Sequence, residues 1–496
     1  MQQNRIEGQN QIYREKLLPG GNVLDLHFKL YSTDGVSLQG QELDRKLKAS
    51  GWKIYQCASD IPEDKVQRNE GLKLDQLSYQ SPKAEKLRRR LFTKIAIPGE
   101  EGRLSAEIKE SALEIEERLS AYIEKNNIRS VHVRNIMSLP LQPAATLALY
   151  NLAQSRKDIR FIFHHHDLIW ENDREKIYST PYRKIAELLD KVLYPSLPNS
   201  KHIVINPIAQ RLIFEKRGIK ASLIPDIFDF ERPLPYHTKE GALEEAWKEK
   251  DRKFRERNDI DENDIIVGMM TRVTKRKNIE TAIQFADELK KELDRRLEKE
   301  DKIVLGFPPR EYRKRNKIWL FLPQKEDLND NLEYFQELEK YAKKRNVALL
   351  TSQEVTADEK YTGQTEVIPF YASYQHVDLV CYPPEHEGFG NQLIEAAWAR
   401  RPLTLFRYPV FEEYIAPHFP HFASMENGKK LIPKSSYSEG MNILEYEAMK
   451  TGVTETINLL RSPNLHLWLN ENFHYMKLFC DSERNIDKYT SLYQSS

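Results

Sequence analysis

The stretch PPEHEGFGNQLIEAAWARRP, residues 383–402, decides the fold class because it joins a strand to a helix through a glycine-containing loop. The apolar run DLVCYP (378–383) is typical of a buried strand, and a helical pattern begins near Asn391. Glycine lets a ligand approach the backbone closely, and free N–H groups at a helix N-terminus attract anions. A strand, a glycine loop and a helix in this order are typical of ligand-binding turns in doubly wound α/β domains.

The same alternation of apolar runs and helical patterns continues on both sides of this loop. Strands at this spacing, separated by helices, indicate parallel sheets that are covered on both faces. The predicted strands are 22–28, 53–58, 130–136, 161–166 and 202–206 in the first half, and 264–270, 318–322, 347–352 and 378–383 in the second half. The predicted helices include 38–50, 278–297 and 331–345.

A charged segment divides this pattern into two domains, as a chain of 496 residues requires. Residues 231–263 begin with two prolines and lack a core pattern, which is typical of an interdomain linker with a solvated helix. We therefore expect an N-terminal Rossmann-like domain over 1–250, including the start of this linker, and a C-terminal Rossmann-like domain over 264–475. A terminal helix over 476–496 is expected to pack back on the N-terminal domain.

Composition excludes several classes of protein. Lys and Arg total 76 against 75 for Asp and Glu, so the net charge of +1 offers no general attraction for nucleic acid. Cys57, Cys381 and Cys480 lie far apart, which favours neither a disulfide framework nor a zinc site. No window approaches the roughly 20 apolar residues of a membrane span. We expect a cytoplasmic protein, with peripheral docking at the inner face of the membrane through the basic stretch 82–94 as the alternative to a solvated segment.

Two carboxylates in the 383–402 stretch are candidate ligand-binding groups. Glu387 and Glu395 are eight residues apart, which places them two turns apart on similar faces of the loop–helix unit. The first carboxylate can accept hydrogen bonds from sugar hydroxyls, and the second can accept them from ribose hydroxyls. The alternative is that Glu387 only caps the helix and that Glu395 is an exposed helical acid.

EGFGNQLIE (387–395) resembles the E-x7-E signature of glycosyltransferase family 4, whose members have the GT-B fold, two Rossmann-like doubly wound domains facing a central cleft. The resemblance implies that the domain over 1–250 is on the acceptor side and that the domain over 264–475 binds a nucleotide sugar. It also implies that Glu387 contacts the donor sugar and that Glu395 holds the ribose of the nucleotide sugar. The donor-binding groups expected around Glu387 are those of Gly388, Phe389, Gly390 and Asn391.

GMMTRVTKRKNIETAI (268–283) resembles a second feature of that family, a strand ending in an Arg with a Lys five residues later at a helix start. These residues are Arg272 and Lys277. The resemblance implies that both bind the donor and neutralise the departing diphosphate, where charge develops in the transition state. A solvated basic turn is the alternative, since Lys275 and Arg276 are also cationic.

The first half resembles the same family at two turns. DGVSLQGQELDRKLKASGWKI (34–54) takes the place of a Gly-Gly turn that lines the cleft near the phosphates, with Gly35 retained and Asp34 replacing the first glycine. HHHDLIWE (164–171) resembles a strand-end His-Asp, which implies that His166 is the catalytic histidine near the donor sugar. Three consecutive histidines suggest a metal, but side chains alternate on a strand, so one ion could hardly collect all three. We expect no metal ligand and structural roles for the other two histidines.

The acceptor side is expected to include Asp167, Trp170 and Glu171. IPDIFDFE (224–231) departs from the family's Pro-Asn-Gly-Val-Asp-like turn. FRYPVFEEYI (406–415) replaces a common Gly-Gly-x-x-Glu loop and resembles that of enzymes extending small glycosylated solutes, such as mannosylglucosylglycerate synthases. A cell-envelope or polysaccharide glycan is the alternative acceptor.

The resemblance, over residues 22–480, implies a retaining hexosyltransferase without a catalytic metal or cofactor, acting from a UDP-glucose or GDP-mannose type donor on a hydroxyl acceptor. The catalytic residues implied are His166, Arg272, Lys277 and Glu387. A GT-B epimerase and a non-catalytic nucleotide-sugar-binding protein are the alternatives. A nicotinamide oxidoreductase needs a G-x-G-x-x-G turn, which neither Gly35 nor the GFG turn supplies.

Overall fold

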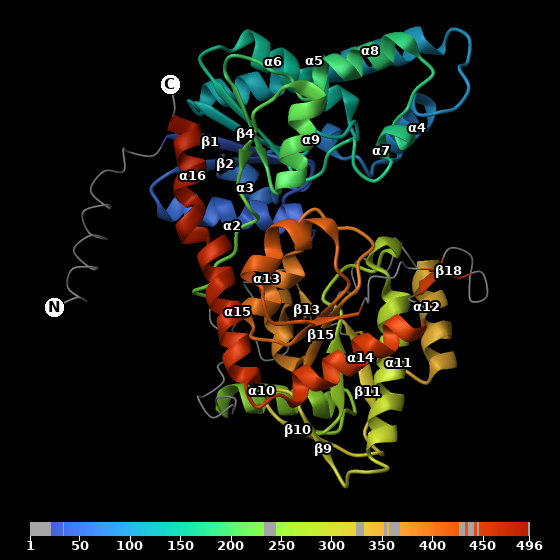
Figure 1. Ribbon diagram of the computed structural model, residues 1–496. Helices are drawn as coiled ribbons and strands as arrows, with labels where there is room; N and C mark the ends of the chain where they lie inside the picture. The colour runs from blue at the N-terminus through green and yellow to red at the C-terminus, as the bar shows by residue number, and fades with distance from the viewer. Residues whose placement is uncertain are drawn as a thin grey trace, which may run out of the picture. The chain divides into compact units, whose positions relative to one another are not determined.

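The computed structural model describes residues 21–32, 34–232, 245–323, 332–351, 355–356, 368–425, 432–434, 441–443 and 446–494 (Figure 1). The chain divides into two compact units. The first unit is formed by Met1–Ile227 together with Ser482–Ser496, and the second by Phe228–Asp481. Each unit is built on one parallel sheet.

The sheet of the first unit has the strand order β3-β2-β1-β4-β5-β6-β7. Its strands are β1 (Asn22–Leu26), β2 (Lys53–Ala58), β3 (Gly71–Lys73), β4 (Ser130–Arg134), β5 (Arg160–His165), β6 (Ser200–Val204) and β7 (Ser222–Leu223). The chain winds outward from β1 in one direction and then returns to β4 on its other side, where Val23 pairs with Ser130 in parallel register. The order therefore reverses between β1 and β4, as in doubly wound sheets.

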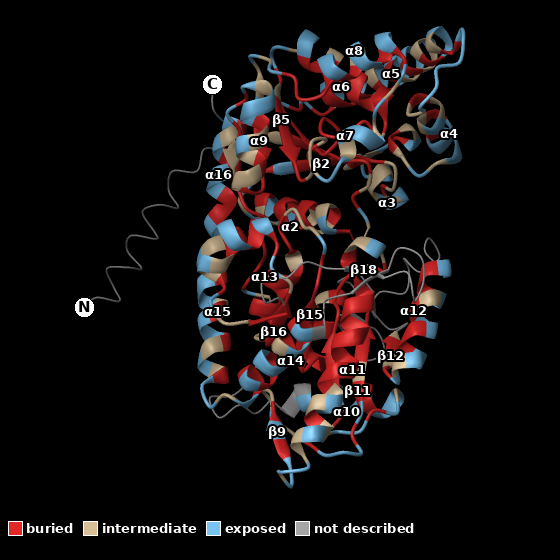
Figure 2. Cartoon of the chain, turned by 45° about the vertical axis from the view of Figure 1, so that its right-hand side comes forward, coloured by how far each residue is buried: buried red, intermediate tan, exposed pale blue. Residues whose placement is uncertain are grey.

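Helices cover both faces of this sheet because apolar side chains point alternately to either face (Figure 2). Leu24 and Phe163 belong to the core beneath one helix layer, whereas Val23 and Ile162 pack with the opposite layer, which includes α2 and α16. The helices are α2 (Gly35–Ala49), α3 (Glu63–Gln67), α4 (Pro82–Leu91), α5 (Glu100–Lys125), α6 (Pro143–Ser155), α7 (Arg174–Ile177), α8 (Arg183–Val192), α9 (Pro207–Arg217) and α16 (Ser482–Gln494), with a 3₁₀ turn at Asp75–Leu77. The C-terminal helix α16 thus lies against α2 within the first unit (Figure 1).

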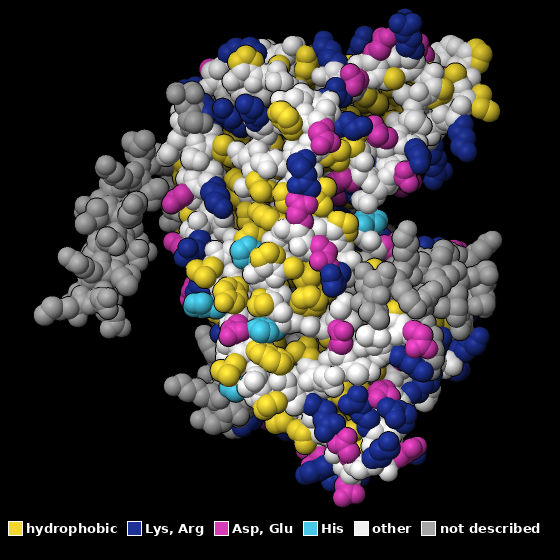
Figure 3. All heavy atoms as spheres, in the orientation of Figure 1, with side chains coloured by type: hydrophobic (Ala, Val, Ile, Leu, Met, Phe, Trp, Pro, Cys, Tyr) yellow, Lys and Arg dark blue, Asp and Glu magenta, His cyan; other side chains and the backbone are white. Residues whose placement is uncertain are grey.

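The basic stretch 82–94 forms α4, and its apolar side chains are not exposed. Leu87 and Leu91 are buried in the core of the first unit, and Phe92 packs against that core. These side chains are therefore unavailable to a lipid surface. On the face seen in Figure 3, basic and acidic side chains are interspersed, in keeping with the net charge of +1.

The sheet of the second unit has the order β12-β11-β8-β15-β16-β17 and is also parallel. Its strands are β8 (Ile265–Gly268), β11 (Ile318–Leu322), β12 (Ala348–Thr351), β15 (Leu379–Tyr382), β16 (Leu403–Leu405) and β17 (Ala423–Ser424). The order reverses between β8 and β15, so the 383–402 stretch leaves the sheet at its switch point. Every strand predicted from the sequence is present in one of the two sheets.

Helices also cover both faces of the second sheet (Figure 2). Leu320 and Leu322 pack with α11, α12 and α14, whereas Phe321 contacts Phe254 of α10 on the opposite face. The helices are α10 (Glu245–Arg257), α11 (Ile279–Arg296), α12 (Leu332–Arg345), α13 (Asn391–Trp398), α14 (Tyr446–Arg461) and α15 (Leu465–Cys480). Short elements are η2 (Lys275–Lys277), η5 (Phe370–His376), η6 (Phe411–Ile415), η7 (Ala416–His418), β9 (Ile303–Leu305), β10 (Arg310–Tyr312), β13 (Val355–Thr356), β14 (Ile368–Pro369), β18 (Ile432–Lys434) and β19 (Met441–Ile443).

Helix α10 is not the solvated linker helix expected from its charged sequence. Phe254 is fully buried and stacks on His376 at 4.0 Å between ring centroids. Asp251 and Arg255 are buried beside it, and Arg255 also donates to Asp378 at 3.2 Å. That expectation is wrong because charged side chains are usually exposed, whereas Asp251 and Arg255 pair with each other inside the unit.

Candidate active site

The residues of the second unit that are expected to bind the donor lie at the carboxyl ends of β8 and β15, whereas Gly35 lies in the first unit. These strands are neighbours, with Val380 paired to Gly268, and they flank the point where strand order reverses. Ligands of doubly wound sheets bind at such a switch point. The backbone N–H of Glu385 donates to the carbonyl of Arg276 at 3.1 Å, which ties the loop after β15 to the loop after β8.

Glu387 is the centre of this cluster. Its Oε1 atom accepts hydrogen bonds from Arg276 Nη1 at 3.0 Å and from Lys277 Nζ, and its carboxylate also accepts one from the Tyr382 phenol. Helix α13 begins after Gly390 without a side-chain cap. Glu387 therefore does not cap the helix, and that alternative is wrong.

The charges of this cluster are mutually adjusted. Burial raises the pKa of Glu387, but the adjacent Lys277 ammonium and Arg276 guanidinium outweigh burial and hold its pKa below the usual value. Burial lowers the pKa of Lys277 to about 8 against the pull of Glu387, and the like charges of Arg276 and Arg272 act in the same direction as burial. Arg272, Arg276 and Glu387 thus all lie near the Lys277 ammonium at the switch point, and this group of cations is suited to binding a strongly anionic ligand.

The family motif does not include Arg276, and the alternative interpretation places it with Lys275 in a solvated basic turn. That description fits Lys275, which is exposed and lies over the ring of Tyr334 at 5.9 Å. The only sequence signal for Arg276 is its position directly before Lys277. A residue contact across 111 positions, to Glu387, has no local signature.

Glu395 lies on α13 and is buried, with 7% of the residue exposed. Its Oε2 atom accepts a hydrogen bond from the Tyr374 phenol at 2.6 Å. Burial raises the pKa of Glu395 to about 7, although Tyr374, Arg232 and Lys277 each favour the carboxylate. The exposed-acid alternative for Glu395 is therefore wrong, and its burial near Lys277 places it in the same region.

The GFG turn between the two carboxylates has a fixed shape. Gly390 has a φ of 112°, and a Cβ atom there would overlap the hydroxyl of Tyr408. That hydroxyl donates to the carbonyl of Phe389, whose ring is buried. Asn391, the first residue of α13, has its side-chain Oδ1 buried, and no described residue forms a hydrogen bond with it. The structure thus places the Gly388–Asn391 turn beside Glu387, and Tyr408 as a support that the sequence did not indicate.

In the first unit, Gly35 begins α2 at the carboxyl end of β1. The N-cap residue Asp34 accepts hydrogen bonds from the backbone N–H groups of Val36 at 3.1 Å and Ser37 at 3.2 Å. Lys29 Nζ lies 3.4 Å from the same carboxylate. The N-terminus of α2 is therefore capped by an anionic side chain of its own chain.

The three consecutive histidines point to alternate sides, as strand geometry requires. The rings of His164 and His166 lie 4.1 Å apart on one side, whereas His165 contacts His202 at 2.9 Å and Ser138 at 2.6 Å. Burial lowers the pKa of His164 and His165 well below the ordinary value, so both are neutral structural residues. His166 directly follows β5, and its Nδ1 atom lies 3.5 Å from Asp226 Oδ1.

The residues expected on the acceptor side hold one another in the loop after β5. Asp167 pairs with Arg174 at 2.7 Å, and Glu171 accepts a hydrogen bond from the backbone N–H of Leu168 at 2.6 Å. Trp170 stacks on Tyr194 at 4.5 Å. Burial raises the pKa of Glu171 to about 7. These contacts give the loop a defined shape, and its contact with an acceptor stays a prediction.

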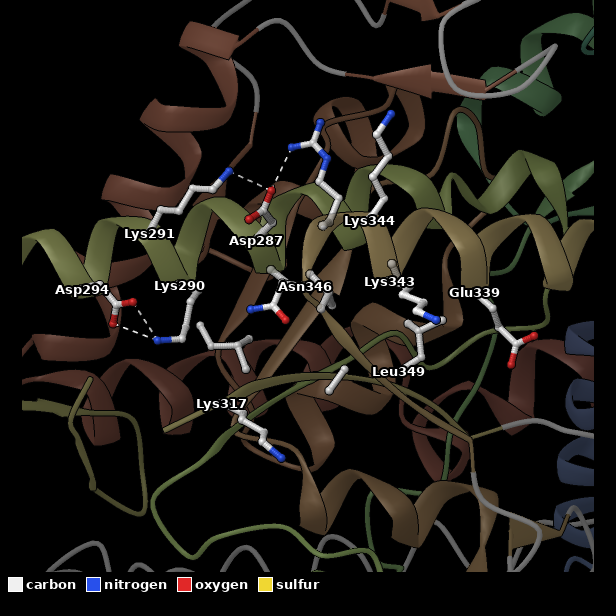
Figure 4. Close-up of a pocket in the computed structure, with 16 residues that line it drawn as sticks. Asp287, Lys290, Lys291, Asp294, Lys317, Glu339, Lys343, Lys344, Asn346 and Leu349 are labelled. Atoms are coloured by element: carbon white, nitrogen blue, oxygen red, sulfur yellow. Dashed lines mark hydrogen bonds and ion pairs between the residues drawn. The ribbon is translucent and has the colours of Figure 1, made fainter. Parts of the chain in front are cut away.

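A hollow of about 950 Å³ lies between α11 and α12, away from this cluster (Figure 4). Lys317 and Asn346 line it at the amino ends of β11 and β12, the sheet edge opposite to Glu387. Asp287 is already paired with Lys291 and Arg345, each at 2.9 Å (Figure 4). Lys343, Lys344 and Arg345 form the last turn of α12, where their positive charges complement the negative end of the helix dipole. Their position is therefore explained without a bound anion.

Among the described residues, no three His, Cys, Asp or Glu side chains are grouped as a metal site requires. Within the same part of the chain, no helix combines the length and apolar character needed to cross a bilayer.

Comparisons with known proteins identify the family of this chain. A family model described as "Glycosyl transferases group 1" matches residues 250–431, which include Arg272, Lys277, Glu387 and Glu395. The mannosylglucosylglycerate synthase of Thermotoga maritima is 30% identical over 463 residues, covering 93% of this chain and 97% of that protein. The mannosylglucosylglycerate synthase of Petrotoga mobilis is 28% identical over 463 residues, covering 92% and 98%.

The fold is likewise shared with solved structures. A glycosyltransferase from Rickettsia africae ESF-5 superposes with a TM-score of 0.60 at 14% identity, covering 97% of this chain and 100% of that chain. The two parallel sheets of this chain are thus those of the GT-B fold. The chain belongs to the glycosyl transferases group 1 family, glycosyltransferase family 4, as a hexosyltransferase that uses a nucleotide-sugar donor.

Proposed function

We propose that this enzyme transfers mannose, with retention of anomeric configuration, from a GDP-mannose type donor to glucosylglycerate and so forms mannosylglucosylglycerate. Support for the acceptor and product comes from the names of the two synthases, which align with more than nine-tenths of this chain. The observation that carries the donor chemistry is the cluster of Arg276, Lys277 and Glu387 at the switch point of the second sheet.

The diphosphate of the donor is proposed to bind Arg272 and Lys277. In the structure, Lys277 is paired with Glu387 and is buried, so it is held beside the sheet edge with little freedom to relax into water. A diphosphate offers it a stronger anionic partner than one carboxylate. As the glycosidic bond breaks, negative charge grows on the leaving oxygen, and a preorganised cation there lowers the barrier.

The two carboxylates are proposed to orient the rest of the donor. Glu387 is held as an anion by its cationic neighbours and can accept hydrogen bonds from sugar hydroxyls. Glu395 is proposed to accept them from ribose hydroxyls. Its burial makes such a bond stronger than it would be at a solvated surface.

Transfer is proposed to proceed on one face of the sugar. The C1–O bond to the diphosphate breaks, and the acceptor hydroxyl oxygen forms its bond to C1 from the same side. The hydroxyl proton passes to the departing diphosphate oxygen, so no side-chain nucleophile is needed and configuration is retained. Arg272 and Lys277 are proposed to supply the cationic charge for this step without a catalytic metal. The role of His166 beside the sugar stays a prediction from the family resemblance.

Calorimetric titration with UDP- and GDP-hexoses in EDTA, followed by incubation with glucosylglycerate, tests the proposal. We expect saturable binding of GDP-mannose, and a product whose new anomeric linkage, determined by NMR, matches that of the donor. An inverted linkage or a requirement for divalent metal would overturn the mechanism. Conversion of the sugar nucleotide without any acceptor would instead identify an epimerase, and absence of binding to every nucleotide sugar would favour a non-catalytic protein.

A further inference from the structure

Glu395 is an unusual group to find at a ligand site because it is a single carboxylate taken almost entirely out of water. The residue is 7% exposed and lies on the first turns of α13. An isolated buried carboxylate tends to take up a proton and lose its capacity to accept two hydrogen bonds. A hydrogen-bond donor to one of its oxygens would keep this side chain oriented as an acceptor.

Tyr374 is that group. It is completely buried, and its hydroxyl donates to Glu395 Oε2 at 2.6 Å. Burial raises the pKa of the Tyr374 phenol well above 10, so the hydroxyl stays a donor at every physiological pH. Among the described residues, Tyr374 is the one side chain that donates a hydrogen bond to Glu395.

The segment carrying Tyr374 is anchored on both sides of it. Ser373 Oγ donates to the carbonyl of Phe370 at 2.5 Å, and Arg401 donates to the carbonyl of Gln375 at 3.0 Å. His376 is fixed by Asp251 of α10 at 3.0 Å. Helix α10 and its buried charges thus support the short helix η5, which in turn presents the phenol to α13.

We propose that Tyr374 is a positioning residue for donor binding, whose hydroxyl holds one oxygen of Glu395 so that the other oxygen accepts from a ribose hydroxyl. This inference rests on the proposed contact between Glu395 and ribose. The groups that face Glu395 from the surrounding elements are Tyr374 on η5, Lys277 on η2 and Arg232 near the start of the second unit. Loss of the phenol removes one of three groups that favour the carboxylate, so the pKa of Glu395 should rise further above its value of about 7.

The test compares a ribonucleoside diphosphate with its 2′,3′-dideoxy counterpart, using the base that the wild-type enzyme prefers. Titration calorimetry at pH 7.5 gives both dissociation constants for wild type and for Tyr374→Phe. We expect the variant to bind the ribonucleotide about tenfold more weakly and the dideoxynucleotide within about twofold of wild type. The binding midpoint on a pH series should also move to higher pH for the ribonucleotide.

Tyr312→Phe is a matched control, since it removes a buried phenol whose hydroxyl donates to Asp294 at 2.9 Å, beside the hollow between α11 and α12. It should leave both dissociation constants unchanged. In a Glu395→Gln background, Tyr374→Phe should add no further weakening for the ribonucleotide.

Three outcomes would overturn the inference: equal weakening for the two nucleotides, full ribonucleotide affinity in Tyr374→Phe, or additive losses in the double variant. The underlying role of Glu395 is tested separately. If wild type and Glu395→Gln show the same preference between ribonucleotide and dideoxynucleotide, the ribose contact itself is wrong. If Glu395→Gln loses that preference while Tyr374→Phe keeps it, only the positioning role fails.

Discussion

The ammonium of Lys277 and the carboxylate of Glu387 are in direct contact although the two residues lie 110 positions apart in the chain. The contact exists because β8 and β15 are neighbours at the switch point, so the loops after them meet. This contact holds the buried Lys277 ammonium where the donor diphosphate is proposed to bind. Removal of the ammonium should therefore lower the rate of transfer more than the stability of the fold.

Lys277→Ala should lower kcat about 100-fold, because one preorganised cation facing the leaving group is lost. Glu387 keeps Arg276 and Tyr382 as partners, so the thermal midpoint should change little. Lys275→Ala is the control in the same turn, since Lys275 is exposed and lies over Tyr334. Steady-state kinetics with a saturating donor measure both variants. Wild-type kcat in Lys277→Ala would show that the leaving group is stabilised elsewhere.

The pH dependence of kcat/KM for the donor should be bell-shaped. Glu395, whose pKa is raised to about 7, must lose its proton to accept from ribose, so kcat/KM should rise with pH through that range. Lys277, whose pKa is lowered to about 8, must keep its proton, so kcat/KM should fall at higher pH. Initial rates at low donor concentration, measured from about pH 5.5 to about pH 9.5 so that both limbs are covered, report the pKa values of these groups in the free enzyme.

Two substitutions separate the limbs of that profile. Glu395→Gln should abolish the acid limb while lowering the plateau, because an amide does not titrate. Lys277→Arg should move the alkaline limb beyond the measured range, since a guanidinium stays charged. Retention of both limbs in both variants would assign the profile to other groups.

Much of the second unit could be predicted from its sequence because its signals are local. The apolar runs 264–270 and 378–383 are short and bounded by polar residues, and parallel strands collect their carboxyl ends at one edge. Glu387 and Lys277 each lie in the loop after such a run, so their proximity could be inferred from the family motif and from sheet geometry alone. The structure confirms the elements and brings the charged groups together.

The supporting residues could not be predicted because their contacts are tertiary. Tyr374 lies in a 3₁₀ helix of seven residues, which is too short for an amphipathic pattern to be recognised, and its partner Glu395 lies 21 residues away on another element. Tyr408 contacts the GFG turn only because β15 and β16 are adjacent. In α10, Asp251 and Arg255 are read as a solvated face, although they are buried through pairing. The composition of a segment shows that its side chains are charged, but whether they are buried depends on tertiary ion pairs that the sequence does not show.

Gly390→Ala should destabilise the GFG turn by about 1–3 kcal/mol and weaken donor binding. The φ of 112° is costly for alanine, and the added Cβ overlaps the Tyr408 hydroxyl. Gly102→Ala on α5 is the control, since no atom of the described residues lies within 4 Å of its added Cβ, and it should be neutral or slightly stabilising. Urea unfolding and nucleotide titration measure the two effects. Tyr408→Phe in the Gly390→Ala background should restore only part of the loss, because it relieves the overlap and leaves the φ strain; complete recovery would show that φ is not strained.

Acid should destabilise the first unit through its buried histidines. Burial lowers the pKa of His27 and His202 to about 4 and that of His165 well below the ordinary value, so these rings are neutral when folded. In the unfolded chain they take up protons below about pH 6.5. The free energy of unfolding should therefore be constant in this respect above that pH and fall below it, by at most about 1.4 kcal/mol per pH unit for each ring.

Hydrogen exchange on the amides of β5 and β6, measured at several pH values and corrected for intrinsic rates, gives this dependence for the first unit alone. His202→Gln removes one titrating ring, and its amide can replace the hydrogen bonds to His165 and to the carbonyl of Pro195. The slope of the free energy of unfolding against pH, between about pH 6.5 and 5, should then decrease by the contribution of one bound proton. An unchanged slope in this variant would mean that His202 is already protonated in the folded enzyme and that the acid sensitivity arises from its carboxylates.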